Sequence, residues 1–533
     1  MHALSLARLH TSHSAIALVA FALFCSLLVR PAAVAADTKL PDPGKLITVA
    51  ELEPIVGKIS QGPKPIDAPE GGVSSEFTLG NDDWVTLTIY PTSKYTIEDA
   101  KRILGGPKPI SLPEFGKGRL TNVVMLGCVL ARPWLPKAER WWWFFPIFSF
   151  VCAIGIWVTN PEDLYYGATV CRHIDFKDAM YLFLSDVTIG PVAAYLGMRC
   201  FRSEGDLKTW YRVLTGFGLF YSALILIELR FSPQIHTWVY GYHANDAFDQ
   251  TMRFGGYRPV VLMVHGLATS LFMLAPTMCS MVYARYKMPI WKLSGSQAAW
   301  FLTIVLILCK STAVWTYGLI ALPLARWGSA KTMNRVACVL AVLVCLYPWL
   351  RATGNFPVEG ILDIAGSISE ERQLSLKFRF DNEDVLLEHA MKKPWFGWGV
   401  SYGRNMLYDE RGGLMTVTDG GWIIALGNAG LMGLAGFLAI PVICIFATAR
   451  RSKRIKDPKL RTMLAVLNLY VALHWVDILP NGVLTLLPYF LGAAICVLSD
   501  RLSRAKVPRP EPRPRSVAVP SQPMPGQPAG DFA

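Results

Sequence analysis

The side chains best suited to chemistry lie in one polar stretch, residues 353–437, of a chain that is otherwise largely apolar. Arg379 precedes an acidic run and Arg404 follows a glycine-rich turn. Asp419 lies just before the next apolar run. Guanidinium groups bind phosphate oxygens through paired hydrogen bonds, and a carboxylate can accept a proton. These residue types together predict a site that binds an anion and moves a proton.

The glycine-rich turn, PWFGWGVSYGRN at 394–405, can be interpreted in two ways. Its glycines allow tight turns, so that backbone N–H groups and Arg404 could meet a phosphate. The alternative is a plain glycine-rich loop beneath an interfacial aromatic belt. Trp398 could likewise stack on a sugar ring or simply lie at the membrane interface.

Further candidates lie outside the polar stretch. Arg253 and Arg258 flank a Gly-Gly-Tyr turn and could form a second phosphate or sugar contact, or an ordinary interfacial charge pair. His265 is expected about two turns into the following helix, either functional or packed. Lys310 interrupts a long apolar run.

A helix is predicted over 381–393 inside the polar stretch. Asp381 is a plausible cap, and Pro394 would end the helix. Apolar residues on one side suit a helix that lies on the surface. Arg379 would then stand at the entrance to this helix.

Composition indicates a polytopic membrane protein, because 52% of the 533 residues are hydrophobic and only 17% are charged. The net charge of +13 comes mostly from basic clusters beside apolar runs, which is typical of cytoplasmic loops. Binding to nucleic acid is therefore not expected. The 11 Cys show no CxxC spacing, so neither a disulfide framework nor a metal site is expected, and no cofactor is implied.

The apolar runs predict an all-α polytopic protein with about eleven spans, each of roughly twenty residues. The runs are 120–135, 141–158, 179–198, 211–229, 259–283, 296–325, 333–351, 422–448, 463–479 and 482–499. Basic clusters flank 296–325 on both sides, so this run is expected to form a hairpin of two short helices with Lys310 near its periplasmic tip. The alternative is one long helix with Lys310 buried.

The expected organisation places the protein in a bacterial inner membrane, with the mature N-terminus and the long loop periplasmic and the C-terminus cytoplasmic. The segments are 1–36, a signal peptide or uncleaved anchor; 37–118, a small periplasmic α+β segment; 119–351, the first eight spans; 352–421, the large periplasmic loop; 422–500, the last three spans; and 501–533, a disordered tail.

The order of three motifs resembles the O-antigen ligase / O-antigen polymerase superfamily of bacterial membrane glycan transferases. The motifs are SLKFRFDNEDVLLEHAMKK, PWFGWG and VTDGGWIIALGNAGLMGL, and the similarity covers roughly residues 259–448. The resemblance implies a glycan donor on a polyprenyl diphosphate, a glycan or lipid acceptor, and no metal. A flippase and a chain-length regulator are candidate partners beside the lipid bilayer.

The resemblance also implies residue roles. Lys310 in CKST matches a basic residue that the family carries at a periplasmic helix tip, although Lys lacks the bidentate fork of Arg. Arg379 matches the arginine before the loop helix, and its neighbour Arg372 competes for that assignment. A snorkelling lysine and a structural salt bridge are the respective alternatives.

This chain departs from the family at Thr418-Asp419-Gly420, where a His-Asn pair is usual. Asp419 could serve as the base in place of the histidine, or it could cap the helix that follows.

The leading hypothesis is thus a glycan transferase that polymerises or ligates lipid-linked oligosaccharide. A transporter or flippase is a second hypothesis, favoured by Lys310 and the short hairpin. A non-catalytic assembly component built around residues 37–118 is the third.

Overall fold

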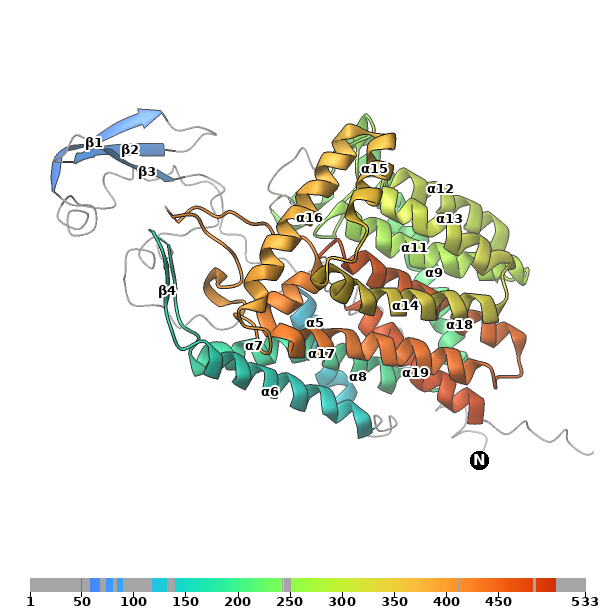
Figure 1. Cartoon of the computed structure of the whole chain (residues 1–533). Helices are drawn as coiled ribbons and strands as arrows, with labels where there is room; N and C mark the ends of the chain where they lie inside the picture. The colour runs from blue at the N-terminus through green and yellow to red at the C-terminus, as the bar shows by residue number, and fades with distance from the viewer. Residues whose placement is uncertain are drawn as a thin grey trace, which may run out of the picture.

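The structure is a computed structural model. It describes residue 49 and residues 58–67, 73–79, 84–89, 117–131, 140–167, 169–241, 243, 251–410, 412–482 and 486–504. The predicted signal segment 1–36, most of 37–118 and the tail beyond 504 lie outside the described residues. Within the described part, helices dominate (Figure 1).

Three short strands form the described part of the N-terminal segment. β1 (Ile59–Asp67) pairs antiparallel with β2 (Val73–Leu79), which pairs antiparallel with β3 (Trp84–Ile89). Thr78 pairs with Trp84, and the residues between these two strands lie outside the described part of the chain.

Six of the described helical segments are long and apolar enough to cross a membrane, which makes the chain an α-helical membrane protein. They contain α6 (Phe144–Thr159), α7 (Phe176–Ile189) continued by α8 (Pro191–Cys200), α9 (Glu204–Phe231), α11 (Gly266–Arg285), α14 (Ala330–Ala352) and α17 (Gly421–Ser452). The other predicted spans are also helical, but shorter or less apolar. They are α5 (Lys117–Leu130), α12 (Gly295–Leu308), α13 (Thr312–Trp327), α18 (Pro458–Ile478) and α19 (Leu487–Arg504).

The run at 296–325 is broken where the polar interruption predicted a break. Lys310 has a left-handed backbone (φ 52°) between α12 and α13. The Trp315 indole N–H donates to the carbonyl oxygen of Ile307 across the break, at 3.0 Å. One continuous helix over this run is therefore wrong.

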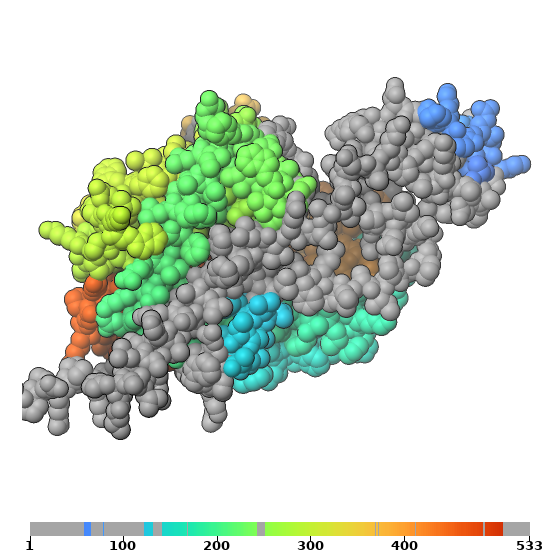
Figure 2. Space-filling model, turned by 180° about the vertical axis from the view of Figure 1, so that it is seen from behind, coloured from blue at the N-terminus to red at the C-terminus, as the bar shows by residue number. Residues whose placement is uncertain are grey.

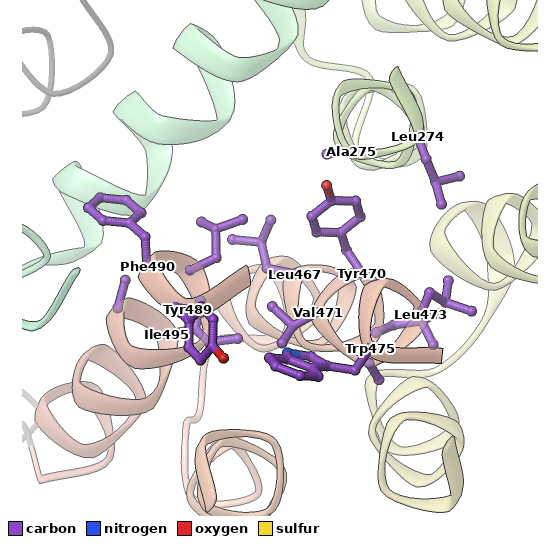
Figure 3. Close-up of a cluster of buried hydrophobic side chains, with 14 of the residues drawn as sticks. Leu274, Ala275, Leu467, Tyr470, Val471, Leu473, Trp475, Tyr489, Phe490 and Ile495 are labelled. Atoms are coloured by element: carbon purple, nitrogen blue, oxygen red, sulfur yellow. The ribbon is translucent and has the colours of Figure 1, made fainter. Parts of the chain in front are cut away.

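The core of the bundle is α18, which is buried along nearly its whole length. Figure 3 shows Tyr470 and Trp475 of α18 among apolar side chains of α11 and α19. Seen from behind, green and yellow-green α9, α12 and α13 gather at the upper left of the molecule, and cyan α5 lies at the lower centre (Figure 2). Because α18 is enclosed by its neighbours, polar groups on it must face protein or a cavity.

The polar stretch contains two helices, α15 (Val358–Ile368) and α16 (Glu370–Met391). The helix predicted at 381–393 therefore begins at Glu370, and Asp381 is not a cap. Asp381 lies inside α16 and pairs with Lys377 one turn earlier, at 3.0 Å. The start was wrong because no residue from 370 to 381 breaks a helix; the predicted end before Pro394 is confirmed.

A break in α17 explains the glycine-rich turn. Ala429 and Gly430 have non-helical backbone angles, which interrupt the hydrogen-bond ladder. Residues 394–399 supply the missing partners: the Leu431 amide donates to the Pro394 carbonyl at 2.7 Å, and the Trp398 amide donates to the Gly427 carbonyl at 2.8 Å. Irregular backbone at membrane depth requires such replacement partners.

Replacing Gly430 with Ala is expected to destabilise the protein. Gly430 has φ +63°, and a Cβ there would lie 2.4 Å from the backbone of Trp395. The strained backbone alone should cost roughly 1–3 kcal/mol. Gly427→Ala is the matched control, because its Cβ would meet only an ordinary contact at 3.6 Å. Thermal melting of the two purified variants measures the difference, and equal melting temperatures would contradict this account of the break.

Candidate functional site

Two residues predicted as catalytic form an ion pair. Arg379 Nε of α16 lies 3.3 Å from Asp419 Oδ2, just before α17, and the two side chains are 37% and 41% exposed. The cap of α17 is Gly420 rather than Asp419, so a capping role does not account for this carboxylate. The pair is open to solvent and can meet a ligand.

Arg258 is a buried cation near this pair. It follows the two-stranded hairpin of β6 (Met252–Arg253) and β7 (Gly256–Tyr257), and it is only 4% exposed. Its Nε has no hydrogen-bond partner among the described residues. Burial first, and the charge of Arg253 second, lower the pKa of Arg258 to about 10. The group therefore remains charged at neutral pH, and Asp477 is a described acid whose charge acts on it. A buried guanidinium with an unpaired Nε is costly, and an anionic ligand would lower that cost.

Lys310 and His265 complete this side of the site. The Lys310 amine lies against Gly256, 2.5 Å from where a Cβ would be. His265 Nδ1 accepts from the Leu267 amide at 3.1 Å and so caps α11. Its predicted place two turns into the helix is wrong, because α11 begins only at Gly266.

The environment of His265 shows that the cations converge. Burial, followed by the charges of Arg258, Arg253 and Arg379, lowers the pKa of His265 to about 4. We call Arg253, Arg258, Lys310 and Arg379 the cation cluster. Three segments that lie far apart in sequence supply it, with His265 and Asp419 beside it. Such an arrangement can hold a diphosphate and place a carboxylate next to it.

The sequence interpretation missed two buried acids at this site, Asp477 and Glu228. Asp477 of α18 is 1% exposed and accepts from the Tyr317 hydroxyl at 3.2 Å. It lies within electrostatic range of Arg258 and Arg379. An acid inside the apolar run of α18 was the signal that could have revealed it, because ionisable groups in such helices are usually functional.

A buried carboxylate holds the loop that carries Arg258. Glu228 of α9 is fully buried and accepts from three backbone amides, those of Ile235 at 3.0 Å, Val260 at 2.8 Å and Val261 at 2.7 Å. Val261 has a left-handed backbone (φ 55°), which these bonds help to maintain. Glu228 thus fixes the chain between Arg258 and His265.

A second buried network fixes the Arg379–Asp419 pair. Glu383, one turn after Arg379 on α16, accepts from the Trp422 indole at 3.0 Å and the Tyr347 hydroxyl at 2.8 Å. Arg351 of α14 lies 3.4 Å from Glu383 and 2.7 Å from Asp384. Burial raises the pKa of Glu383. These contacts bind α16 to α14 and to the first turn of α17.

Arg404 lies away from the cation cluster and is structural. It is fully buried, and its Nη1 donates to the carbonyl oxygens of Glu162 at 2.7 Å and Arg172 at 2.9 Å. Its Nη2 donates to Asn160 Oδ1 at 3.2 Å. The structure therefore favours a structural role for Arg404 over the predicted phosphate contact, because both of its Nη atoms donate to protein oxygens.

Trp398 is also occupied by the protein. It is 7% exposed, its indole N–H donates to the His389 carbonyl at 2.8 Å, and its ring stacks on His389 with centroids 4.4 Å apart. The Lys393 amine lies 4.7 Å from the ring centroid. Stacking on a sugar is thus corrected to a packing role. Arg372 lies in α16, and its side chain is outside the described residues.

Acid is expected to destabilise the site through His265. Its pKa of about 4 lies below the value of about 6.5 for an unfolded chain. The unfolded state therefore binds the extra proton first, and stability falls as the pH drops from 7 towards 4. His265→Asn retains a capping side chain but does not titrate. Between pH 7 and pH 5 the melting temperature of the wild type should fall more than that of His265→Asn. An equal fall in both proteins would contradict the prediction.

Comparison with known proteins leaves the geometry as the main guide to function. A scan against protein-family models found no matching family, and a search of curated proteins found no similar sequence. The interpretation of the site therefore rests on the residues that the fold brings together.

Proposed function

We propose that this chain is an integral-membrane glycan transferase of the O-antigen ligase/polymerase type, which polymerises or ligates polyprenyl-diphosphate-linked oligosaccharide at the periplasmic face of a bacterial inner membrane. The observation that carries the proposal is the buried Arg258, whose Nε has no hydrogen-bond partner among the described residues, near the Arg379–Asp419 pair. A diphosphate is the anion that best matches several cations gathered at one small site.

The location of the cluster supports a single reaction face. The start of α11, the break at Lys310 and the start of α17 all border it. The opposite ends of these helices carry Arg285, Arg326 and Arg450, as cytoplasmic ends usually do. About eleven spans, including α12 and α13 as a short hairpin, agree with this orientation.

The proposed reaction is a displacement at the anomeric carbon. An acceptor hydroxyl attacks this carbon while its proton passes to the Asp419 carboxylate. The bond from the anomeric carbon to the diphosphate oxygen breaks, and its electron pair stays on the departing diphosphate. The cation cluster stabilises the charge that accumulates there. Glu228 and the Glu383 network hold the participating groups in place.

The break in α17 favours a second candidate, a transporter or flippase for a lipid-linked glycan. Broken helices at membrane depth are typical of transporters. This candidate requires movement of the lipid between leaflets without a new glycosidic bond. A reconstituted assay that scores both products separates the two functions.

Removing either Arg258 or Arg379 from the cation cluster should abolish transfer. Arg258→Gln and Arg379→Ala are each expected to lower the rate on a polyprenyl-diphosphate oligosaccharide by about a hundredfold or more, as loss of one preorganised donor does elsewhere. Gel analysis of the elongated or transferred glycan measures this. Arg230→Gln is the control, because Arg230 is exposed in the last turn of α9. Wild-type product with Arg258→Gln would refute the site.

The base assignment has its own test. Asp419→Asn keeps the size of the side chain but cannot accept the proton, so kcat should fall by about two to four orders of magnitude while the donor still binds. Asp381→Asn, at an exposed ion pair of α16, is the control. Retained turnover in Asp419→Asn would show that the carboxylate only orients Arg379.

A further inference from the structure

Two aromatic side chains meet beside the cation cluster. Phe254 of the β6–β7 hairpin stacks on Trp315 of α13, with ring centroids 5.2 Å apart and an interplanar angle of 19°. The Trp315 indole N–H donates to the carbonyl oxygen of Ile307, so the orientation of its ring is fixed. Phe254 is 54% exposed, which leaves part of the aromatic surface uncovered. An aromatic surface of this kind, next to a group of cations, can bind an apolar group.

Phe254 occupies a backbone position that disfavours its side chain. Arg253 pairs with Gly256 across the hairpin, so Phe254 and Gly255 form a two-residue turn. Both turn residues have left-handed backbones, with φ of 50° and 67°. Such a turn favours Asn or Asp followed by Gly, and a bulky side chain in the left-handed region is an outlier. Residues held in this way cluster at ligand sites, so the turn alone does not account for the aromatic ring.

The same two segments supply both the aromatic rings and two of the cations. The hairpin carries Arg253 next to Phe254. The break between α12 and α13 carries Lys310, a short distance along the chain from Trp315. The Lys310 amine lies against Gly256, so the two segments touch. A cation beside an aromatic ring in each segment suits an amphiphile, in which an anionic group is joined directly to a hydrocarbon.

Asp419, the proposed base, comes from a different part of the chain. It precedes α17 and pairs with Arg379 of α16. A polyprenyl-diphosphate donor carries its sugar on one phosphate and its hydrocarbon on the other. A diphosphate bound among the four cations therefore lies between the carboxylate, which must meet the sugar, and the aromatic pair, which suits the hydrocarbon.

We propose that Phe254 and Trp315 bind the first isoprene units of the donor and make the protein selective for lipid-linked sugars. This inference rests on the proposed function, because it assigns positioning residues for the donor of that reaction. The exposed side chains of Ile307, bonded to Trp315, and of Leu319, one turn further along α13, extend the apolar surface. The aromatic pair makes and breaks no bond. Its contribution is to place the diphosphate among the cations.

Kinetics with two donors test the pair. The full-length protein in detergent micelles is given the same oligosaccharide on polyprenyl diphosphate or on methyl diphosphate, which has no isoprene unit. Phe254→Asn removes the ring and suits the left-handed turn, so the melting temperature should stay close to that of the wild type. Its KM for the polyprenyl donor should rise about tenfold with kcat little changed, whereas its KM for the methyl donor should not change. Equal effects on the two donors, or no effect on the polyprenyl donor, would overturn the inference.

Two further variants separate the aromatic contact from other effects. Phe254→Tyr retains the ring and should keep the wild-type KM for both donors. Trp327→Ala removes an exposed aromatic side chain at the other end of α13 and should change neither KM. A rise in the polyprenyl KM of Trp327→Ala equal to that of Phe254→Asn would refute a specific site.

Photolabelling locates the hydrocarbon without turnover. The probe is a polyprenyl diphosphate with a diazirine in its first isoprene unit, irradiated with the full-length protein in lipid nanodiscs. Peptides that contain Phe254 and Trp315 should be labelled, and unlabelled polyprenyl diphosphate should compete. Phe254→Asn should lower this labelling by about fivefold. Labelling confined to other helices, or labelling that polyprenyl diphosphate does not displace, would overturn the site.

The two proposals fail in different ways. Glycan transfer that is equally efficient from the polyprenyl and methyl donors would overturn the isoprene site and leave the transferase intact. Labelling of the Phe254 and Trp315 peptides with no transfer to any acceptor would overturn the transferase, while the isoprene site would stand. If the pair instead stacks on sugar, the effect of Phe254→Asn will follow the oligosaccharide and not the lipid, and that result would refute the inference.

Discussion

The candidate site depends on holding the charge of Arg258 away from water without an ion pair to it among the described residues, although the buried Asp477 lies within electrostatic range. Burial and the nearby Arg253 lower its pKa to about 10, which still leaves it charged at neutral pH. Such a group destabilises the folded chain, so the surrounding structure must compensate. Glu228 does so locally, because its carboxylate accepts three backbone amides of the adjoining loop. A loop restrained in this way keeps the guanidinium ready for an anion.

The rest of the polar stretch supports the Arg379–Asp419 pair. The Glu383 network fixes α16 against α14 and α17, and residues 394–399 complete the broken ladder of α17. Arg404 ties the same turn to residues 160–172. Glu383 and the Nη atoms of Arg404 are bonded within the protein, whereas Arg379 and Asp419 remain about two-fifths exposed. The contrast separates residues that support the site from residues that can meet a substrate.

The sequence predicted the residues whose place follows from membrane topology. Arg253, Arg258, Lys310, Arg379 and Asp419 were expected in loops on one face, and ends of packed helices on one face lie near one another. Contacts between distant segments could not be foreseen in this way. Arg404 and its partner Asn160 are 244 residues apart, and nothing in the glycine-rich turn predicts that pairing. The start of α16 was missed for a local reason, since helix-forming residues simply continue towards the N-terminus.

The Arg379–Asp419 pair suggests how donor binding and proton transfer could be linked. In the free protein Arg379 Nε lies 3.3 Å from Asp419 Oδ2 and so holds one oxygen of the carboxylate. A diphosphate drawn to the cation cluster would compete for the same guanidinium. The carboxylate oxygen would then be free to meet the acceptor hydroxyl, at the moment when the leaving group is in place. On the proposed function, Asp419 would therefore be available to the acceptor only when a donor is present, and an acceptor bound alone would meet a carboxylate still held by Arg379.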